Sequence, residues 1–198
     1  AKTLRAPNWA KEFYMARDLS FEHPHFVFFA TIRTIASRLW LVNDPKLEHQ
    51  IKAYVARYAE HYGVVLYAFI IMGNHYHLLA RFPKGHKAAF FRDLNGMISR
   101  LTKSRVELFE GGKLWARRVR TQVVPNKEDI VDRFFYTAMN PIAAGLAQKL
   151  SDYTAYNSFS DAIRGKVRLF KVVEWQKYNA RKRTNPGISI AAFTKIHK

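Results

Sequence analysis

The chain has 198 residues and carries 33 lysine and arginine residues against 15 aspartate and glutamate residues, a net charge of +18 at pH 7. So large a basic excess goes beyond what solubility requires and indicates a polyanionic partner. The chain has no cysteine, which excludes disulfides and thiolate metal sites, so any metal must be held by histidine, carboxylate, amide or phosphate oxygen.

The apolar segments are too short to cross a membrane as a helix. The longest apolar run is residues 64–72, whereas a spanning helix needs ~20 residues. The first segment, AKTLRAPNWAKEF, contains no apolar signal core. We therefore expect a cytoplasmic, nucleoid-associated protein with no membrane partner and no small-molecule substrate.

Hydrophobic periodicity predicts alternating strands and helices over most of the chain. The segment 25–33, HFVFFATIR, is typical of a strand, and 45–62 has apolar residues at helical spacing with Gly63 as its stop. Two apolar runs, residues 64–72 and 75–82, flank the turn signal Gly73-Asn74 and predict the two strands of a β-hairpin. Further along we expect a helix over about 87–109, a strand over 114–124, and a helix capped by Asn126.

These elements predict an α+β fold, an antiparallel sheet flanked by helices that lie on one of its faces. The pattern weakens after about residue 156, where a basic segment with interleaved aromatic residues follows. We therefore expect one main domain over residues 1–159 and a partly ordered, basic C-terminal extension over 160–198.

Two histidines interrupt the second strand of the predicted hairpin. Successive strand side chains point to opposite faces at ~3.3 Å per residue, so His75 and His77 share one face and Tyr76 takes the other. Their attachment points would be ~6.6 Å apart, a gap that one metal ion can bridge. The alternative is that both are ordinary polar residues on the open face of a half-buried sheet.

The helix after Asn126 carries a polar stripe that includes Tyr136 and Asn140. Asp129, Asp132 and Arg133 precede them at three- and four-residue steps. We expect Ile130, Phe134 and Phe135 to face the sheet instead. Tyr136 could be an amphipathic residue at a helix edge, and Asn140, followed by Pro141, could be the N-cap of a further short helix.

Four segments in this order and spacing carry a family resemblance: MGNHYHLL, GGKLWARRVRTQ, FFYTAMNPIAAGLA and DYTAYNSF. The chain resembles the REP-associated tyrosine transposases, a branch of the single-tyrosine HUH transposases, over roughly residues 25–159. The resemblance implies an HUH-type, ferredoxin-like or RRM-like core. It implies His75 and His77 as metal ligands, Tyr136 as the nucleophile and Asn140 as the third ligand.

The basic residues after the second predicted helix suit a track of phosphate contacts. Arg118, Arg120 and Gln122 point the same way on the predicted strand, next to the expected site. A solvated charged face is the alternative, and Trp115 could be either a base-stacking platform or a core residue. The predicted nucleic-acid-binding residues are Lys103, Arg105, Trp115, Arg117, Arg118, Arg120 and Gln122, with Arg181, Lys182 and Arg183 extending the track.

The resemblance implies a metal-dependent endonuclease and strand transferase for single-stranded DNA. It would act at hairpin sequences through a 5′-phosphotyrosine intermediate, with Mg²⁺ or Mn²⁺ as cofactor. Two alternatives stay open: a catalytically inactive protein of the same fold that binds DNA hairpins, and a basic RNA-binding protein with structural histidines. The protein could act as a monomer or as a homodimer.

Overall fold

The computed structural model describes residues 21–198 except residues 43 and 110. The segment inspected above for a signal core lies outside the described residues. Along the chain the main elements are β1 (Val27–Arg33), α2 (Pro45–Tyr62), β2 (Val65–Ile71), β3 (His75–Arg81), α3 (Lys87–Arg105), β4 (Arg120–Val124), α4 (Lys127–Ala143), α5 (Phe159–Ile163), β5 (Phe170–Val173), α6 (Trp175–Thr184) and β6 (Thr194–His197).

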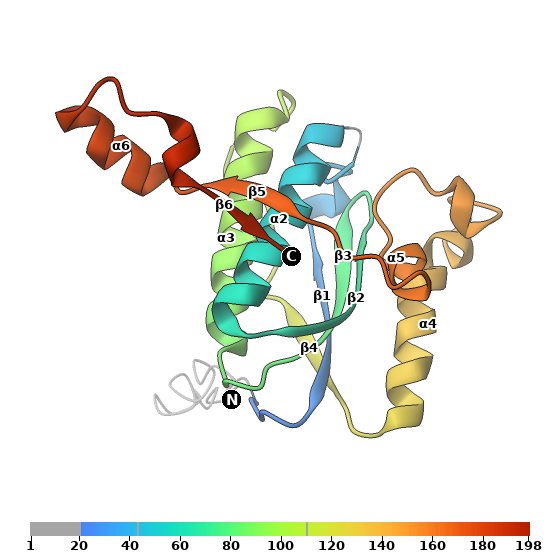
Figure 1. The fold of residues 1–198 in the computed structure, drawn as a ribbon. Helices are drawn as coiled ribbons and strands as arrows, with labels where there is room; N and C mark the ends of the chain where they lie inside the picture. The colour runs from blue at the N-terminus through green and yellow to red at the C-terminus, as the bar shows by residue number, and fades with distance from the viewer. Residues whose placement is uncertain (1–20, 43, 110) are drawn as a thin grey trace, which may run out of the picture.

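The centre of the molecule is a four-stranded sheet with the order β2-β3-β1-β4 (Figure 1). All three strand pairs are antiparallel. Strand β1 lies between β3 and β4, and its Thr31 pairs with His77 on one side and Arg120 on the other. The α+β fold and the antiparallel sheet are confirmed.

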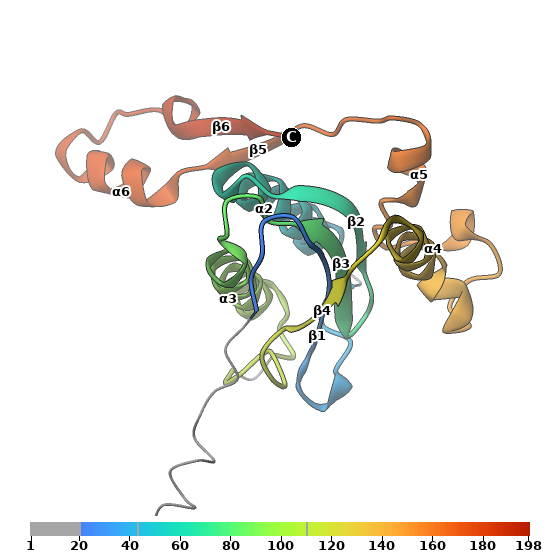
Figure 2. The ribbon, with the colours of Figure 1, turned by 90° about the horizontal axis from the view of Figure 1, so that it is seen from below.

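Helices cover both faces of this sheet, so the prediction of helices on one face was wrong. Helices α2 and α3 pack on the face that carries Phe28, Ile32 and Tyr76, which belong to the main core. Helix α4 packs on the other face, where its Ile130 and Phe134 contact a smaller apolar cluster around Phe29. Figure 2 shows α4 across the sheet from α2 and α3.

Most predicted elements are present with shifted ends. Helix α2 has the predicted bounds because Asp44 caps its first turn, accepting from the backbone N–H groups of Lys46 and Leu47, and Gly63 ends it in the left-handed region. The second predicted helix ends at Arg105 rather than near 109. The predicted strand 114–124 is interrupted: Trp115 makes an isolated bridge to Thr34, and regular pairing resumes only at Arg120.

The C-terminal segment forms ordered structure packed on α2, which the prediction of a partly ordered extension did not anticipate. Strands β5 and β6 form a two-stranded antiparallel sheet that contacts α2 (Figure 1). Phe170 and Val172 of β5 belong to the same core as the main sheet. Strands of four residues are too short to give a clear alternating pattern, so the sequence shows only a basic, aromatic segment.

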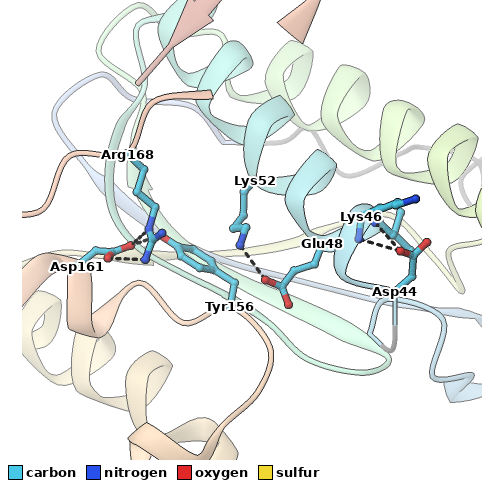
Figure 3. A network of polar contacts seen from close by, with 8 residues as sticks. Asp44, Lys46, Glu48, Lys52, Tyr156, Asp161 and Arg168 are labelled. Atoms are coloured by element: carbon cyan, nitrogen blue, oxygen red, sulfur yellow. Dashed lines mark hydrogen bonds and ion pairs between the residues drawn. The ribbon is translucent and has the colours of Figure 1, made fainter. Parts of the chain in front are cut away.

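The chain between α4 and β5 is fastened to the edge of the sheet and to α2. On the outer edge of β2, the Ile71 N–H donates to the Tyr156 carbonyl. Ser158 donates its N–H to the Phe69 carbonyl and accepts from the Phe69 N–H through its hydroxyl. Figure 3 shows Arg168 paired with Asp161, which also accepts a hydrogen bond from Tyr156, and Lys52 of α2 lies 4.9 Å from the centre of the Tyr156 ring. These contacts cover the β2 edge, which would otherwise expose unpaired backbone groups.

Among residues 21–198, no described helix combines the length and apolar character needed to span a membrane.

Candidate active site

Strand β3 presents the two histidines toward α4 and buries the tyrosine between them. His77 is buried and His75 is half-buried, and their rings meet edge to face with centroids 4.8 Å apart. Tyr76 is fully buried on the opposite face, where its hydroxyl donates to Asn95 Oδ1 at 2.7 Å. The predicted alternation is confirmed, and it follows from the period of two along a strand.

Neighbouring oxygens engage the Nδ1 atoms of both histidines. His75 Nδ1 lies 2.6 Å from Asn74 Oδ1, and His77 Nδ1 lies 2.8 Å from Thr31 Oγ1. Asn74 Oδ1 can only accept, so His75 Nδ1 carries the proton and its Nε2 keeps a lone pair. The two Nε2 atoms face each other at 3.1 Å. If Thr31 accepts in the same way, two lone pairs meet there and would repel unless a cation or a proton lies between them.

Both imidazoles are held in the neutral form that a metal ligand requires. Burial lowers the pKa of His75 to about 4, and the positive charge of Arg33 adds to this shift. Burial likewise lowers the pKa of His77 to about 3, with smaller contributions from His75 and Arg33. Near pH 7 neither ring holds a second proton that a metal would have to displace.

The histidine pair therefore fits a divalent cation. Its remaining ligands would have to be groups other than Asp, Glu or a third His. No group of three or more His, Asp or Glu side chains suited to a metal gathers among the described residues. A third protein ligand would have to be a neutral oxygen, and Asn140 on α4 is the residue predicted for that role. Two nitrogens and one amide oxygen leave positions open for substrate oxygens.

Helix α4 brings Tyr136 against the histidine face. The Tyr136 ring lies edge to face with His77, with centroids 5.9 Å apart, and with Phe29, with centroids 5.7 Å apart. The Arg133 guanidinium lies 5.6 Å from the centre of the Tyr136 ring. Tyr136 is 48% exposed and lines a cleft open to solvent, so its side chain is not enclosed in the core.

Helix α4 continues past Asn140, which removes one of the alternatives considered above. Pro141 lies inside the helix, whose last residue is Ala143, and the Asn140 carbonyl accepts from the Ala144 N–H. Asn140 is therefore not the N-cap of a separate helix. It lies one turn beyond Tyr136, and its half-buried side chain does not serve as a helix cap.

The prediction for the apolar face of α4 needs one correction. Ile130 and Phe134 do pack on the sheet, but Phe135 is 48% exposed. Phe135 lies about 100° around the helix from Phe134, on the side of α4 that is open to solvent. Thr137 and Ala138 are buried beside the sheet instead.

Strand β4 borders the site on its outer side. Gln122 pairs with Phe29 and Arg120 with Thr31, so both side chains share the face toward α4. Between β4 and α4 lies a cleft of about 560 Å³ whose lining includes Gln122, Arg133 and Tyr136. Arg117 and Arg118 are exposed in the irregular stretch before β4. Of the predicted DNA-binding residues, Arg120 and Gln122 therefore lie on the histidine face.

The remaining predicted DNA-binding residues lie elsewhere. Lys103 and Arg105 are on α3, across the sheet from Tyr136, and Arg105 Nε donates to Gln50 Oε1 at 2.6 Å. The Trp115 ring packs edge to face on Tyr76, and its Nε1–H donates to the Asn95 carbonyl. Trp115 therefore takes the core position that was the alternative to base stacking.

Sequence reasoning did not identify Phe29, Thr31 and Arg33 as site residues. At every second position of β1, these three side chains point to the same face as the histidines. Thr31 pairs directly with His77, and Arg33 pairs directly with His75. The signal was present as a threonine and an arginine on one face of an otherwise apolar strand. Only the pairing register, however, shows which histidine each one meets.

Comparison with known proteins places this geometry in context. The sequence matches the family described as "Transposase IS200 like" over residues 23–134, more than half of the chain. The fold matches a solved structure of a REP-associated tyrosine transposase bound to a REP hairpin, with a TM-score of 0.63 and 14% sequence identity over 78% of this chain and 89% of that chain.

A Deinococcus radiodurans R1 crystal structure described as a transposase is 18% identical, with a TM-score of 0.43 over 66% of this chain and 95% of that one. No curated protein matches the sequence.

Proposed function

The chain belongs to the family of IS200-like transposases, and on that premise we propose that it is a metal-dependent endonuclease and strand transferase for single-stranded DNA. It acts at hairpin, REP-like sequences through a 5′-phosphotyrosine intermediate. The observation that carries this proposal is the position of Tyr136 beside His77, at the face where the Nε2 atoms of His75 and His77 meet at 3.1 Å.

The reaction is a transesterification in which Tyr136 is the nucleophile. Its hydroxyl oxygen attacks the phosphorus of the scissile phosphodiester, the new bond joins phosphorus to the tyrosine oxygen, and the bond to the 3′ oxygen breaks. The phenol loses its proton, and the leaving 3′ oxygen gains one. The 5′ phosphate stays on Tyr136, and because the bond energy is conserved, a 3′ hydroxyl of another strand can reverse the step without ATP.

His75 and His77 would hold the divalent ion, with Asn140 as the proposed third ligand. When bound, Mg²⁺ or Mn²⁺ would neutralise charge that develops on the phosphoryl oxygens. Nitrogen ligands favour Mn²⁺ over Mg²⁺. Thr31 and Asn74 orient the two rings through their Nδ1 atoms, so that both Nε2 lone pairs point to the same place.

Arg120 and Gln122 are proposed to position the DNA backbone beside Tyr136, with Arg117 and Arg118 extending the contact. Gln122 lines the cleft beside Tyr136, Arg120 shares its face of β4, and Arg117 and Arg118 are exposed in the stretch before β4. Cationic or amide groups are typical phosphate contacts. Hairpin DNA as the substrate is supported by the solved structure of similar fold, which is bound to a REP hairpin.

Covalent capture tests the proposal directly. The full chain is incubated with single-stranded hairpin oligonucleotides and Mn²⁺, and adducts are separated by denaturing electrophoresis. We expect an adduct with the parent and also with Tyr76→Phe, because the hydroxyl that this variant lacks donates to Asn95 in the core. Tyr136→Phe should bind the hairpin about as well as the parent and give no adduct.

An adduct from Tyr136→Phe would assign the nucleophile to another residue. Hairpin binding by the parent without any adduct, in Mg²⁺ or in Mn²⁺, would favour a binding protein of the same fold. Binding to RNA alone would remove the DNA assignment altogether.

A further inference from the structure

A second cleft lies on the side of the molecule that α2 and α3 cover, across the sheet from Tyr136. It has a volume of about 500 Å³, within the range of ~300–1,000 Å³ that ligand sites occupy. The end of β5 and the start of the C-terminal helix α6 form part of its lining. Its lining residues are Tyr54, Arg57, Tyr58, Met97, Arg100, Val173, Glu174, Trp175, Gln176 and Lys177.

Aromatic rings form the floor and one rim of this α2–α6 cleft. Tyr54 and Tyr58 lie one helical turn apart on α2, with centroids 5.9 Å apart and ring planes 31° apart. Trp175, the first residue of α6, is 49% exposed and touches Tyr178 edge to face, at 5.9 Å between centroids. A half-exposed indole in a cleft that also holds other aromatic rings can stack a further planar group.

The same cleft carries cationic side chains and little free negative charge. Arg57 lies over the Tyr54 ring at 6.0 Å, and Arg100 stands exposed on the α3 wall. Glu174 is the one carboxylate of the lining, and it is paired with Lys177 at 3.0 Å and with Lys195 at 3.6 Å. Burial raises the pKa of Tyr58, so that phenol also stays neutral.

Helix α6 continues the positive charge away from the cleft. Between Trp175 and Thr184 it has no acidic residue, and its last turn carries Arg181, Lys182 and Arg183. Cations in the last turn of a helix interact favourably with the helix dipole, but three in succession also repel one another. A polyanion along this helix would relieve that repulsion.

We propose that the α2–α6 cleft is a second binding site for a single-stranded polynucleotide, with a base stacked on Trp175 and phosphates held by Arg57, Arg100 and the basic end of α6. Exposed aromatic faces interleaved with cations are the combination that binds single strands without reading their sequence. In this proposal residues 160–198 are an extension that adds a site to the transposase domain of residues 1–159. The inference does not depend on cleavage at Tyr136.

The test measures binding of the full chain to an oligo-dT that cannot form a hairpin, about 12 nucleotides long, which is within the ~4–16 nucleotides that single-strand binding modules cover. It is done in EDTA, so that no metal chemistry contributes. Trp175→Ala should weaken binding about fivefold or more, as removal of a stacking platform does, while Trp175→Phe keeps most of the affinity. Arg57→Gln with Arg100→Gln should weaken binding more than Arg164→Gln, which changes an exposed arginine directly after α5.

Photocrosslinking of an oligo-dT containing 5-iododeoxyuridine, followed by peptide mapping, should recover the peptide that contains Trp175. Unchanged affinity of Trp175→Ala for both oligo-dT and oligo-U, or crosslinks confined to α4 and β4, would overturn the proposal. Equal loss of oligo-U and oligo-dT binding in Trp175→Ala supports it for both polynucleotides, and loss of oligo-U binding alone supports an RNA ligand. Because this binding is measured in EDTA with an oligonucleotide that forms no hairpin, failure of cleavage and failure of this site are distinguishable.

Discussion

A Thr31→Val substitution removes one hydroxyl group from the proposed metal site and keeps the size and β-branched shape of the side chain. Thr31 Oγ1 lies 2.8 Å from His77 Nδ1. In the proposed site this hydroxyl accepts from the Nδ1–H and so holds the Nε2 lone pair toward His75. Valine cannot accept that proton, and the His77 ring is then free to turn or to change tautomer.

The size of the effect follows from the position of this hydrogen bond. Partners that orient a metal-binding histidine typically account for about 10–100-fold in metal affinity or activity. His77 is 6% exposed, so water cannot freely replace the lost partner. The unpaired N–H should also cost roughly 1–3 kcal/mol of folding free energy.

The assay is a Mn²⁺ titration of adduct formation, together with calorimetric Mn²⁺ binding in the absence of DNA. Thr31→Val should raise the Mn²⁺ concentration at half-maximal adduct about 10–100-fold, with hairpin affinity unchanged within a few-fold. Thr102→Val is a matched control, because the Thr102 hydroxyl is buried and finds no hydrogen-bond partner in the described structure. A Mn²⁺ requirement in Thr31→Val equal to that of the parent would refute the assigned role of Thr31.

Three further predictions follow from the same geometry. His75→Ala and His77→Ala should each abolish adduct formation but keep hairpin binding within a few-fold of the parent, since phosphate contacts dominate affinity; full activity in EDTA would contradict this. The affinity for single-stranded DNA should fall with salt, with a log–log slope near −0.7 for each phosphate neutralised, and a flat response would mean that the charge serves another purpose. The metal-free protein should lose stability as the pH falls from about 6.5 toward 4, because burial lowers the pKa of both histidines and the unfolded chain takes up protons that the folded chain does not. Urea midpoints at pH 7 and pH 5 in EDTA measure this loss, which should shrink in His77→Ala.

The sequence was most informative for elements in which apolar residues recur at a regular spacing. Helix α2 was predicted at its observed bounds, and the β2–β3 hairpin to within a residue at each strand end. The split of β3 into Tyr76 on one face and two histidines on the other needed only the strand period. These features are local, so pattern and capping residues determine them.

Features that depend on pairing or on distant packing could not be predicted in the same way. The contact of Thr31 with His77 joins residues 46 positions apart, and only the β1–β3 register brings them together. A new helix beginning at Pro141 was one of two alternatives left open by the sequence, yet Pro141 lies inside α4, which ends at Ala143. Trp115 looked like a DNA-binding residue because of the arginines beside it, and the isolated bridge to Thr34 turns it into the core.

The geometry of the histidine face depends on packing on the opposite face of the sheet. A shift of β3 by one residue against β1 would move Tyr76 toward α4 and put both histidines in the core. Tyr76 opposes that shift, since its buried ring packs on Phe69 and its hydroxyl donates to Asn95 on α3. The core under α2 and α3 therefore fixes the register that places Thr31 beside His77. The same packing brings the two Nε2 atoms to 3.1 Å from each other, on the face where the Tyr136 ring contacts His77.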